Sequence, residues 1–258
     1  MRCIVVLGSI LVSIAAVVHA EPVGHFYSLS EHGVIPKERL QTIANRVEKN
    51  FHSIDIEHST VKVVDSFPQL QPLDALVIYL DTDMAPKDVG PGRDDCPLSD
   101  YDVGESDILN KQSYDQMKER LGFDYDVETV QGSVVYICPG RLLFLYKLQR
   151  MLADKEDEPL TDKDIDSILA SAATHEIAHT LGAVHVFKIG DPLYIPAEGD
   201  FLGSVITYAS DSTKFHEGNV EKIKDFIGYA KSLKNKIDMP TLNSKKTYLL
   251  YDFIIQSK

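Results

Sequence analysis

The residues best suited to chemistry lie in one short stretch near the middle of the chain. His175 and His179 are four residues apart, so on a helix their imidazoles project from one face about one turn apart. Glu176 lies about 100° round the helix from His175, close enough to act on something bound between the histidines. Gly182 allows a sharp turn that brings His185 back toward the same point. Three neutral imidazoles meeting there predict a tripodal zinc site with one position open for water.

A long buried helix must position these residues. It is predicted to begin at Thr161, which can cap it, and to end at Gly182, with Asp162 and Asp164 at the positive end of its dipole. Buried ionisable groups are costly unless they are paired or bind a metal. A single histidine there could be a core residue satisfied by the backbone, whereas three at this spacing favour a metal. Apolar residues lie nearly all round the helix, which predicts burial: Ile165, Ile168, Leu169, Ala172, Ala173, Ile177 and Leu181.

The stretch from His175 to His185 resembles the signature HExxHxxGxxH of the metzincin family of zinc endopeptidases, and all five signature positions match. The resemblance implies that His175, His179 and His185 hold one catalytic Zn²⁺. It also implies that Glu176 is the general base that takes a proton from a water whose pKa the zinc lowers, in the hydrolysis of a protein or peptide substrate. A thermolysin-like protein would instead use a downstream glutamate as its third ligand.

Further features of the family are matched in part. Family members place a methionine turn after the third histidine, and the best match here has Ile206 at the methionine position and Tyr208 at the tyrosine position. The resemblance implies that Ile206 packs beneath the zinc and that Tyr208 contacts the oxyanion or the zinc, although a purely structural tyrosine fits equally well. The residues around Gly182 resemble the reprolysin branch, but that branch has Asp where this chain has Val186, so the subfamily stays open.

The fold class expected is α+β, with the resemblance implying a twisted mixed sheet, a central zinc-binding helix and a C-terminal helix. A continuous apolar run over 75–80 predicts a central strand. Apolar spacing predicts the remaining elements: helices over 36–51, 141–153, 161–181 and 218–234, and strands over 60–64 and 133–137.

Acidic residues dominate the composition. Lys and Arg total 26 against 39 Asp and Glu, a net charge of −13, which argues against nucleic acid or an anionic membrane surface as partner. Nine of the acids lie among Pro and Gly over 81–107, which predicts a long surface loop. Calcium is possible there, but the spacing matches no known calcium loop, so a solvated acidic loop is favoured. The oligomeric state cannot be read from the sequence.

The first twenty residues are predicted to be a signal peptide, since Arg2 precedes an apolar run and cleavage is expected after Ala20. A membrane anchor is the alternative, but the run is short for a span. Residues 21–258 would then form a single metzincin-like catalytic domain, secreted to the extracellular space. In that oxidising environment Cys96 and Cys138 would form one disulfide. A less favoured alternative makes Cys96 an inhibitory thiolate on the metal.

A second function stays open at this point, namely a secreted binding protein that keeps the fold and the zinc but cleaves nothing. Ile206 and Val186, which depart from the family pattern, keep this alternative open. Glu176 argues for the enzyme, because a zinc site of three histidines does not need it to bind metal.

Overall fold

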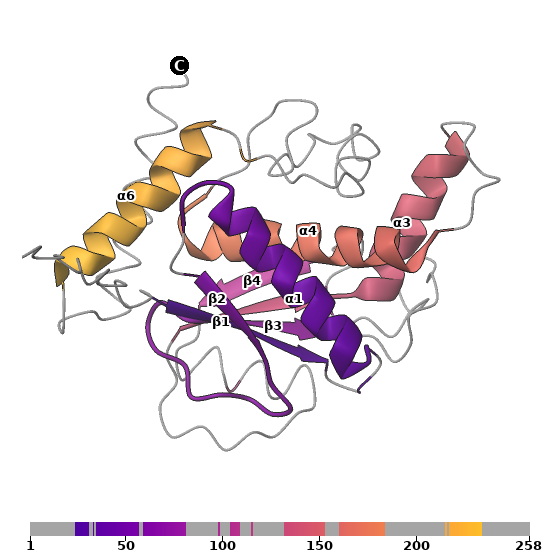
Figure 1. Ribbon diagram of the computed structural model, residues 1–258, viewed down its shortest axis with the longest axis horizontal. Helices are drawn as coiled ribbons and strands as arrows, with labels where there is room; N and C mark the ends of the chain where they lie inside the picture. Colours follow the sequence, from indigo (N-terminus) through magenta and orange to yellow (C-terminus); the bar gives the residue numbers. More distant parts are fainter. Residues whose placement is uncertain are drawn as a thin grey trace, which may run out of the picture.

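The computed structural model describes residues 24–30, 33, 35–56, 59–80, 98, 104–108, 115, 132–152, 160–183, 215 and 217–233. This part of the chain is a mixed α/β fold in which helices pack on a five-stranded sheet (Figure 1). Its helices are α1 (Lys37–His52), α3 (Pro139–Leu152), α4 (Asp162–Thr180) and α6 (Glu217–Leu233). Among the described residues, no helix is long and apolar enough to cross a membrane.

The sheet has the strand order β2-β1-β3-β5-β4, so β3 is central, as predicted. Four strands are parallel and β4 alone runs antiparallel, against β5. The expected mixed sheet is therefore confirmed, but the α+β class is corrected to mixed α/β, because β1, α1 and β2 form a parallel crossover unit. The strands are β1 (Gly24–Ser30), β2 (Ser59–Val63), β3 (Ala75–Tyr79), β4 (Gly104–Ile108) and β5 (Ser133–Ile137).

Alternate residues of the central strands supply two separate hydrophobic clusters. Val77 and Val135 belong to the larger cluster, which also includes apolar residues of α1 and α4. Leu76 and Val134 belong to the second cluster, together with Leu98. Because successive side chains of a strand point to opposite faces, the two clusters lie on opposite faces of the sheet. Both faces of β3 and β5 are thus buried, which explains why these strands read as continuous apolar runs.

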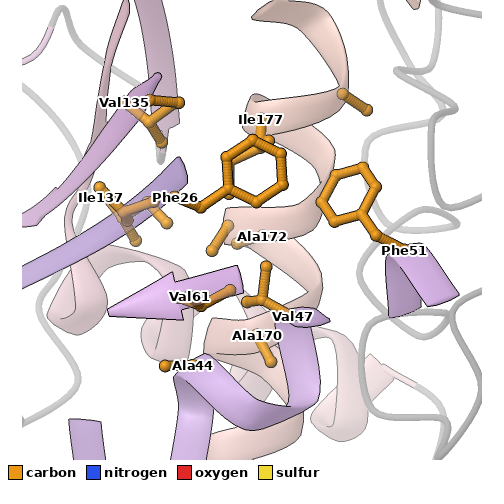
Figure 2. Packing of buried hydrophobic residues seen from close by; sticks show 14 of the residues in the cluster. Phe26, Ala44, Val47, Phe51, Val61, Val135, Ile137, Ala170, Ala172 and Ile177 are labelled. Carbon is orange, nitrogen blue, oxygen red and sulfur yellow. The ribbon is translucent and has the colours of Figure 1, made fainter. Parts of the chain in front are cut away.

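Helix α1 packs on the sheet through the apolar stripe that its sequence predicts. All five predicted residues are buried: Leu40, Ile43, Ala44, Val47 and Phe51. The ring of Phe51 lies 5.1 Å from the ring of Phe26 in β1, and Ile177 of α4 belongs to the same hydrophobic cluster (Figure 2). It also lies 5.6 Å from the ring of Phe215, just before α6. Aromatic contacts therefore connect β1, α1 and the start of the last described helix.

Helix α4 begins with the cap that the sequence predicts. The Thr161 hydroxyl accepts a hydrogen bond from the backbone N–H of Asp164 (3.2 Å), and the Asp164 carboxylate accepts one from the backbone N–H of Thr161 (2.9 Å). This reciprocal capping box satisfies two backbone donors at once, and the carboxylate also favours the helix dipole. The rest of α4 is buried on nearly every side, as expected from its apolar residues.

Polar pairs that the sequence did not predict join α4 to α1. Arg39 Nε donates to Asp166 Oδ1 (2.6 Å), near the start of both helices. About two turns further along α1, Arg46 donates to the hydroxyl of Ser167, the residue that follows Asp166 in α4. Since a buried polar group without a partner costs free energy, these pairs fix how the two helices lie against each other.

The last of these pairs lies directly beside the first zinc-ligand candidate. Asn50 Nδ2 donates to the hydroxyl of Thr174 (3.0 Å), which in turn donates to the carbonyl of Ala170 (2.7 Å). Thr174 is completely buried and precedes His175. The hydroxyl therefore uses both its hydrogen and a lone pair in an environment without water.

Three element predictions need correction. Helix α3 begins at Pro139, two residues before the predicted start, because proline is well suited to the first helical position. Strand β1 was not predicted. Strand β4 occupies the end of the segment assigned to the acidic loop, because pairing with β5 gives a strand to residues with little strand propensity of their own. Apart from Leu98, residues 81–103 lie outside the described residues.

Thr174→Val should destabilise the protein by about 1–3 kcal/mol, because valine has the same shape but leaves the Asn50 amide without its acceptor. Thr42→Val is the matched control, since Thr42 also donates to a carbonyl four residues back in a helix, that of Glu38, but is exposed. The control should change stability by less than about 0.5 kcal/mol. Urea unfolding measures the free energy of unfolding of both variants, provided that its dependence on urea concentration stays the same. Equal midpoints for the two variants would show that the Asn50–Thr174 pair does not contribute to stability.

Cys138, fully buried immediately after β5, is disulfide-bonded, and its partner lies outside the described residues. The pairing with Cys96 remains a prediction. Peptide mapping of unreduced protein should recover one peptide pair that joins Cys96 to Cys138, and thiol titration in denaturant should find neither of them free. A map that joins Cys138 to Cys3, or a free thiol at Cys96, would contradict the pairing.

Candidate metal centre

The last turns of α4 place His175 and His179 side by side. Their ring centroids are 4.6 Å apart with the planes nearly perpendicular, and their two Nε2 atoms are 3.0 Å apart. His175 is buried, at 3% exposed, whereas His179 is half-buried. The helical spacing thus brings the two predicted ligands together as expected.

The end of α4 fixes the hydrogen position on His179. Its Nδ1 lies 2.9 Å from the backbone carbonyl oxygen of Ala183. A carbonyl oxygen can only accept, so Nδ1 carries the hydrogen and the neutral ring keeps its lone pair on Nε2. That lone pair faces Nε2 of His175 at 3.0 Å, so either a hydrogen from His175 or a cation must lie between the two nitrogens.

The arrangement fits a zinc ion. Zinc binds imidazole nitrogen at about 2.0–2.1 Å, so two nitrogens on one ion can be no more than about 4 Å apart, and the observed separation satisfies this. Imidazole is also a donor that zinc accepts readily. No group of three metal-binding side chains occurs in the part of the chain that the structure describes, since the third predicted ligand, His185, lies outside it.

Glu176 lies at the edge of this pair. Its Oε1 is 3.9 Å from Nε2 of His175, and its side chain is 13% exposed. The carboxylate therefore lies beside the two imidazole nitrogens, beyond hydrogen-bonding distance of His175 Nε2, and it is partly accessible to solvent. This is the position that a general base needs to reach a water held beside the histidines.

The chain turns at Gly182 as predicted. Gly182 has φ +89°, a left-handed conformation that glycine adopts without strain. Its N–H donates to the carbonyl of His179 (3.1 Å), and the N–H of Ala183 donates to the carbonyl of Ala178 (3.0 Å). These two bonds form a Schellman motif, which reverses the chain after a helix. The turn begins the path toward His185, two residues beyond Ala183.

The remaining predicted site residues lie outside the described residues: His185, Ile206, Tyr208 and Cys96. The structure thus brings together two of the three predicted ligands and the predicted base. The sequence did not point to the carbonyl of Ala183 as a partner of His179. The glycine that ends the helix was the available signal, because a Schellman turn fixes the orientation of the peptide that follows it.

Away from the histidines, the pKa values of two buried groups are raised: Asp74, just before β3, and Tyr79, at the end of β3. Burial raises the pKa of Asp74, although the backbone N–H groups of His25 (2.7 Å) and Gln71 (2.8 Å) stabilise its carboxylate. Burial, and secondly the charge of Asp166, raises the pKa of Tyr79, whose hydroxyl has no hydrogen-bond partner among the described residues. Asp74 joins backbone segments at the amino ends of the strands, which is a structural role.

No known protein family and no curated protein matches the chain. Solved structures that are similar to it at low identity include the two that follow. Archaemetzincin from Methanopyrus kandleri is 12% identical, with a TM-score of 0.41 over 78% of this chain and 94% of that one. A zinc-dependent peptidase from Methanocorpusculum labreanum is 13% identical, with a TM-score of 0.42 over 77% of this chain and 99% of that one. Because identities and TM-scores are both low, neither likeness assigns a family or an activity to this chain.

Proposed function

We propose that this protein is a secreted zinc-dependent endopeptidase of the metzincin type, with His175, His179 and His185 as ligands and Glu176 as general base. One observation carries the proposal: two imidazole nitrogens lie 3.0 Å apart on a buried helix, with a carboxylate beside them. Two imidazole nitrogens at this separation can bind one zinc ion together, because each would lie about 2.0–2.1 Å from it. The resemblance of the signature from His175 to His185 supports zinc and peptide hydrolysis, and the N-terminal segment supports secretion.

The protein's own residues have distinct tasks in the proposed reaction. A zinc ion bound by the three histidines would supply a Lewis acid and lower the pKa of a water. Glu176 would take a proton from the attacking water and then give it to the amine nitrogen that leaves the cleaved peptide bond. Its partial exposure lets water and substrate reach the carboxylate. His175 and His179 stay neutral, and the Ala183 carbonyl holds the hydrogen of His179 on Nδ1.

An edge strand offers a place for an extended substrate. Strand β4 packs against α4 and is the outermost strand of the sheet beside β5. Within the described residues, no strand pairs with its outer edge. An unpaired edge presents backbone donors and acceptors, and a peptide can add to it as a further strand. This mode of binding would hold a peptide through its backbone, close to the helix that carries Glu176.

The purified mature protein should contain one zinc ion, and His179→Ala should lose it, because each ligand is needed for tight binding. His52→Ala is the matched control, since His52 is an exposed helical histidine without ligand spacing. Metal analysis after gel filtration through a chelator measures the zinc content, and circular dichroism checks the fold. Stoichiometric zinc in folded His179→Ala protein would refute the site.

Glu176→Gln should lower peptide hydrolysis by roughly 10²–10⁴-fold while the zinc content and the melting temperature stay unchanged, because glutamine keeps the shape but cannot take a proton. Glu221→Gln in α6 is the control, since Glu221 is exposed and far along the sequence from the histidines. Digestion of a mixed peptide library by zinc-loaded protein gives the rates. If zinc-loaded wild-type protein cuts no peptide, the binding-protein alternative replaces the enzyme.

A further inference from the structure

The two nitrogens of the His179 ring face different groups. Nδ1 faces the carbonyl of Ala183, and Nε2 faces His175. In water, neutral imidazole prefers to carry its hydrogen on Nε2, which would leave that nitrogen unable to bind a metal. The Ala183 carbonyl reverses this preference, because it accepts a hydrogen bond only from a ring protonated on Nδ1.

The position of that carbonyl depends on the turn at Gly182. The N–H of Ala183 is tied to the carbonyl of Ala178 (3.0 Å), and Ala183 is buried in the main hydrophobic cluster. The peptide that follows Gly182 therefore has little freedom, and its oxygen is directed back at the helix. A left-handed residue is required at 182 for this geometry, and φ +89° strains any residue that carries a Cβ.

We propose that Gly182 is a positioning residue for His179: its turn presents the Ala183 carbonyl to Nδ1 and so sets the metal-binding tautomer before any metal arrives. This role is separate from leading the chain toward His185, since the carbonyl belongs to a residue that precedes His185. Naming His179 as a metal ligand rests on the proposed function. The tautomer of its ring does not, because it follows from the contact between Nδ1 and the Ala183 carbonyl.

The expected effect on zinc affinity follows from the preference of neutral imidazole for a hydrogen on Nε2. A ring with the wrong tautomer has to move its hydrogen before Nε2 can bind, which weakens metal binding without removing a ligand. Loss of such an orienting partner typically costs 10–100-fold in metal affinity. The loss of metal affinity should be smaller for residues at position 182 that tolerate a left-handed backbone. Asparagine tolerates this conformation far better than the β-branched valine.

The test measures the tautomer directly, in full-length mature chain freed of metal. Nitrogen-15-labelled histidine and two-bond proton–nitrogen correlation, at a pH where the ring is neutral, show which nitrogen of His179 carries the hydrogen. The comparison is made in a His185→Ala background, which removes the second role of the turn. With Gly182 the hydrogen should sit on Nδ1, Gly182→Asn should keep it there, and Gly182→Val should move the population toward Nε2.

Zinc affinity, measured by competition with a chelator in chain that keeps His185, should fall 10–100-fold for Gly182→Val and much less for Gly182→Asn. A hydrogen found on Nε2 of His179 in the unmutated turn overturns the proposal, and this measurement is also made on the chain that carries no substitution. So does folded Gly182→Val protein with an unchanged tautomer. If the protein binds no zinc, the proposed function fails, while the tautomer still decides the role of Gly182.

Discussion

Helix α4 is buried on nearly every side, and every polar group on it must therefore find a partner inside the protein. This constraint accounts for the contacts along its length. Asp166 and Thr174 are paired with Arg39 and Asn50 of α1. Near its C-terminus His179 meets both His175 and a backbone carbonyl. The helix that carries the candidate chemistry is thus held by polar contacts in directions where apolar packing alone would allow rotation.

Burial of α4 also restricts the side-chain conformations of the histidines in the candidate metal centre. A histidine on a solvated helix can adopt several side-chain conformations and either tautomer. Here burial limits the side-chain conformations of His175, and the hydrogen bond from His179 to the Ala183 carbonyl selects one tautomer of His179. The two candidate ligand nitrogens are brought together by the fold itself, so binding of an ion would require little further ordering of these side chains. Glu176, the next residue, keeps partial access to solvent.

Helices and strands could be predicted from the sequence where the apolar spacing within a single segment reflects which of its residues are buried. The stripe from Leu40 to Phe51 and the strand at 75–79 were predicted because their apolar spacing reflects burial directly. The pairing of His175 with His179 followed from helix geometry alone. In each case the information is local, within a turn or two of helix or one strand.

The parts that were missed depend on partners far away in the chain. Arg39 and Asn50 look like solvent-exposed residues of α1, and their partners in α4 lie more than 120 residues later. Strand β4 exists through pairing with β5 rather than through its own residues. The Ala183 carbonyl is a backbone group that every residue has, so only its orientation after Gly182 distinguishes it.

The contact between the rings of Phe215 and Phe51 has a consequence for how the chain folds. Phe51 is completely buried, and part of its cover comes from a residue synthesised long after α1. While the chain is still emerging from the ribosome, α1 and β1 can associate, but the aromatic rings at this end stay exposed to water. Closing this part of the core must wait for the segment around α6, and a contact of such long sequence separation is one that slows folding. A nascent or truncated chain that lacks α6 exposes a hydrophobic aromatic surface, and such surfaces promote aggregation and bind chaperones.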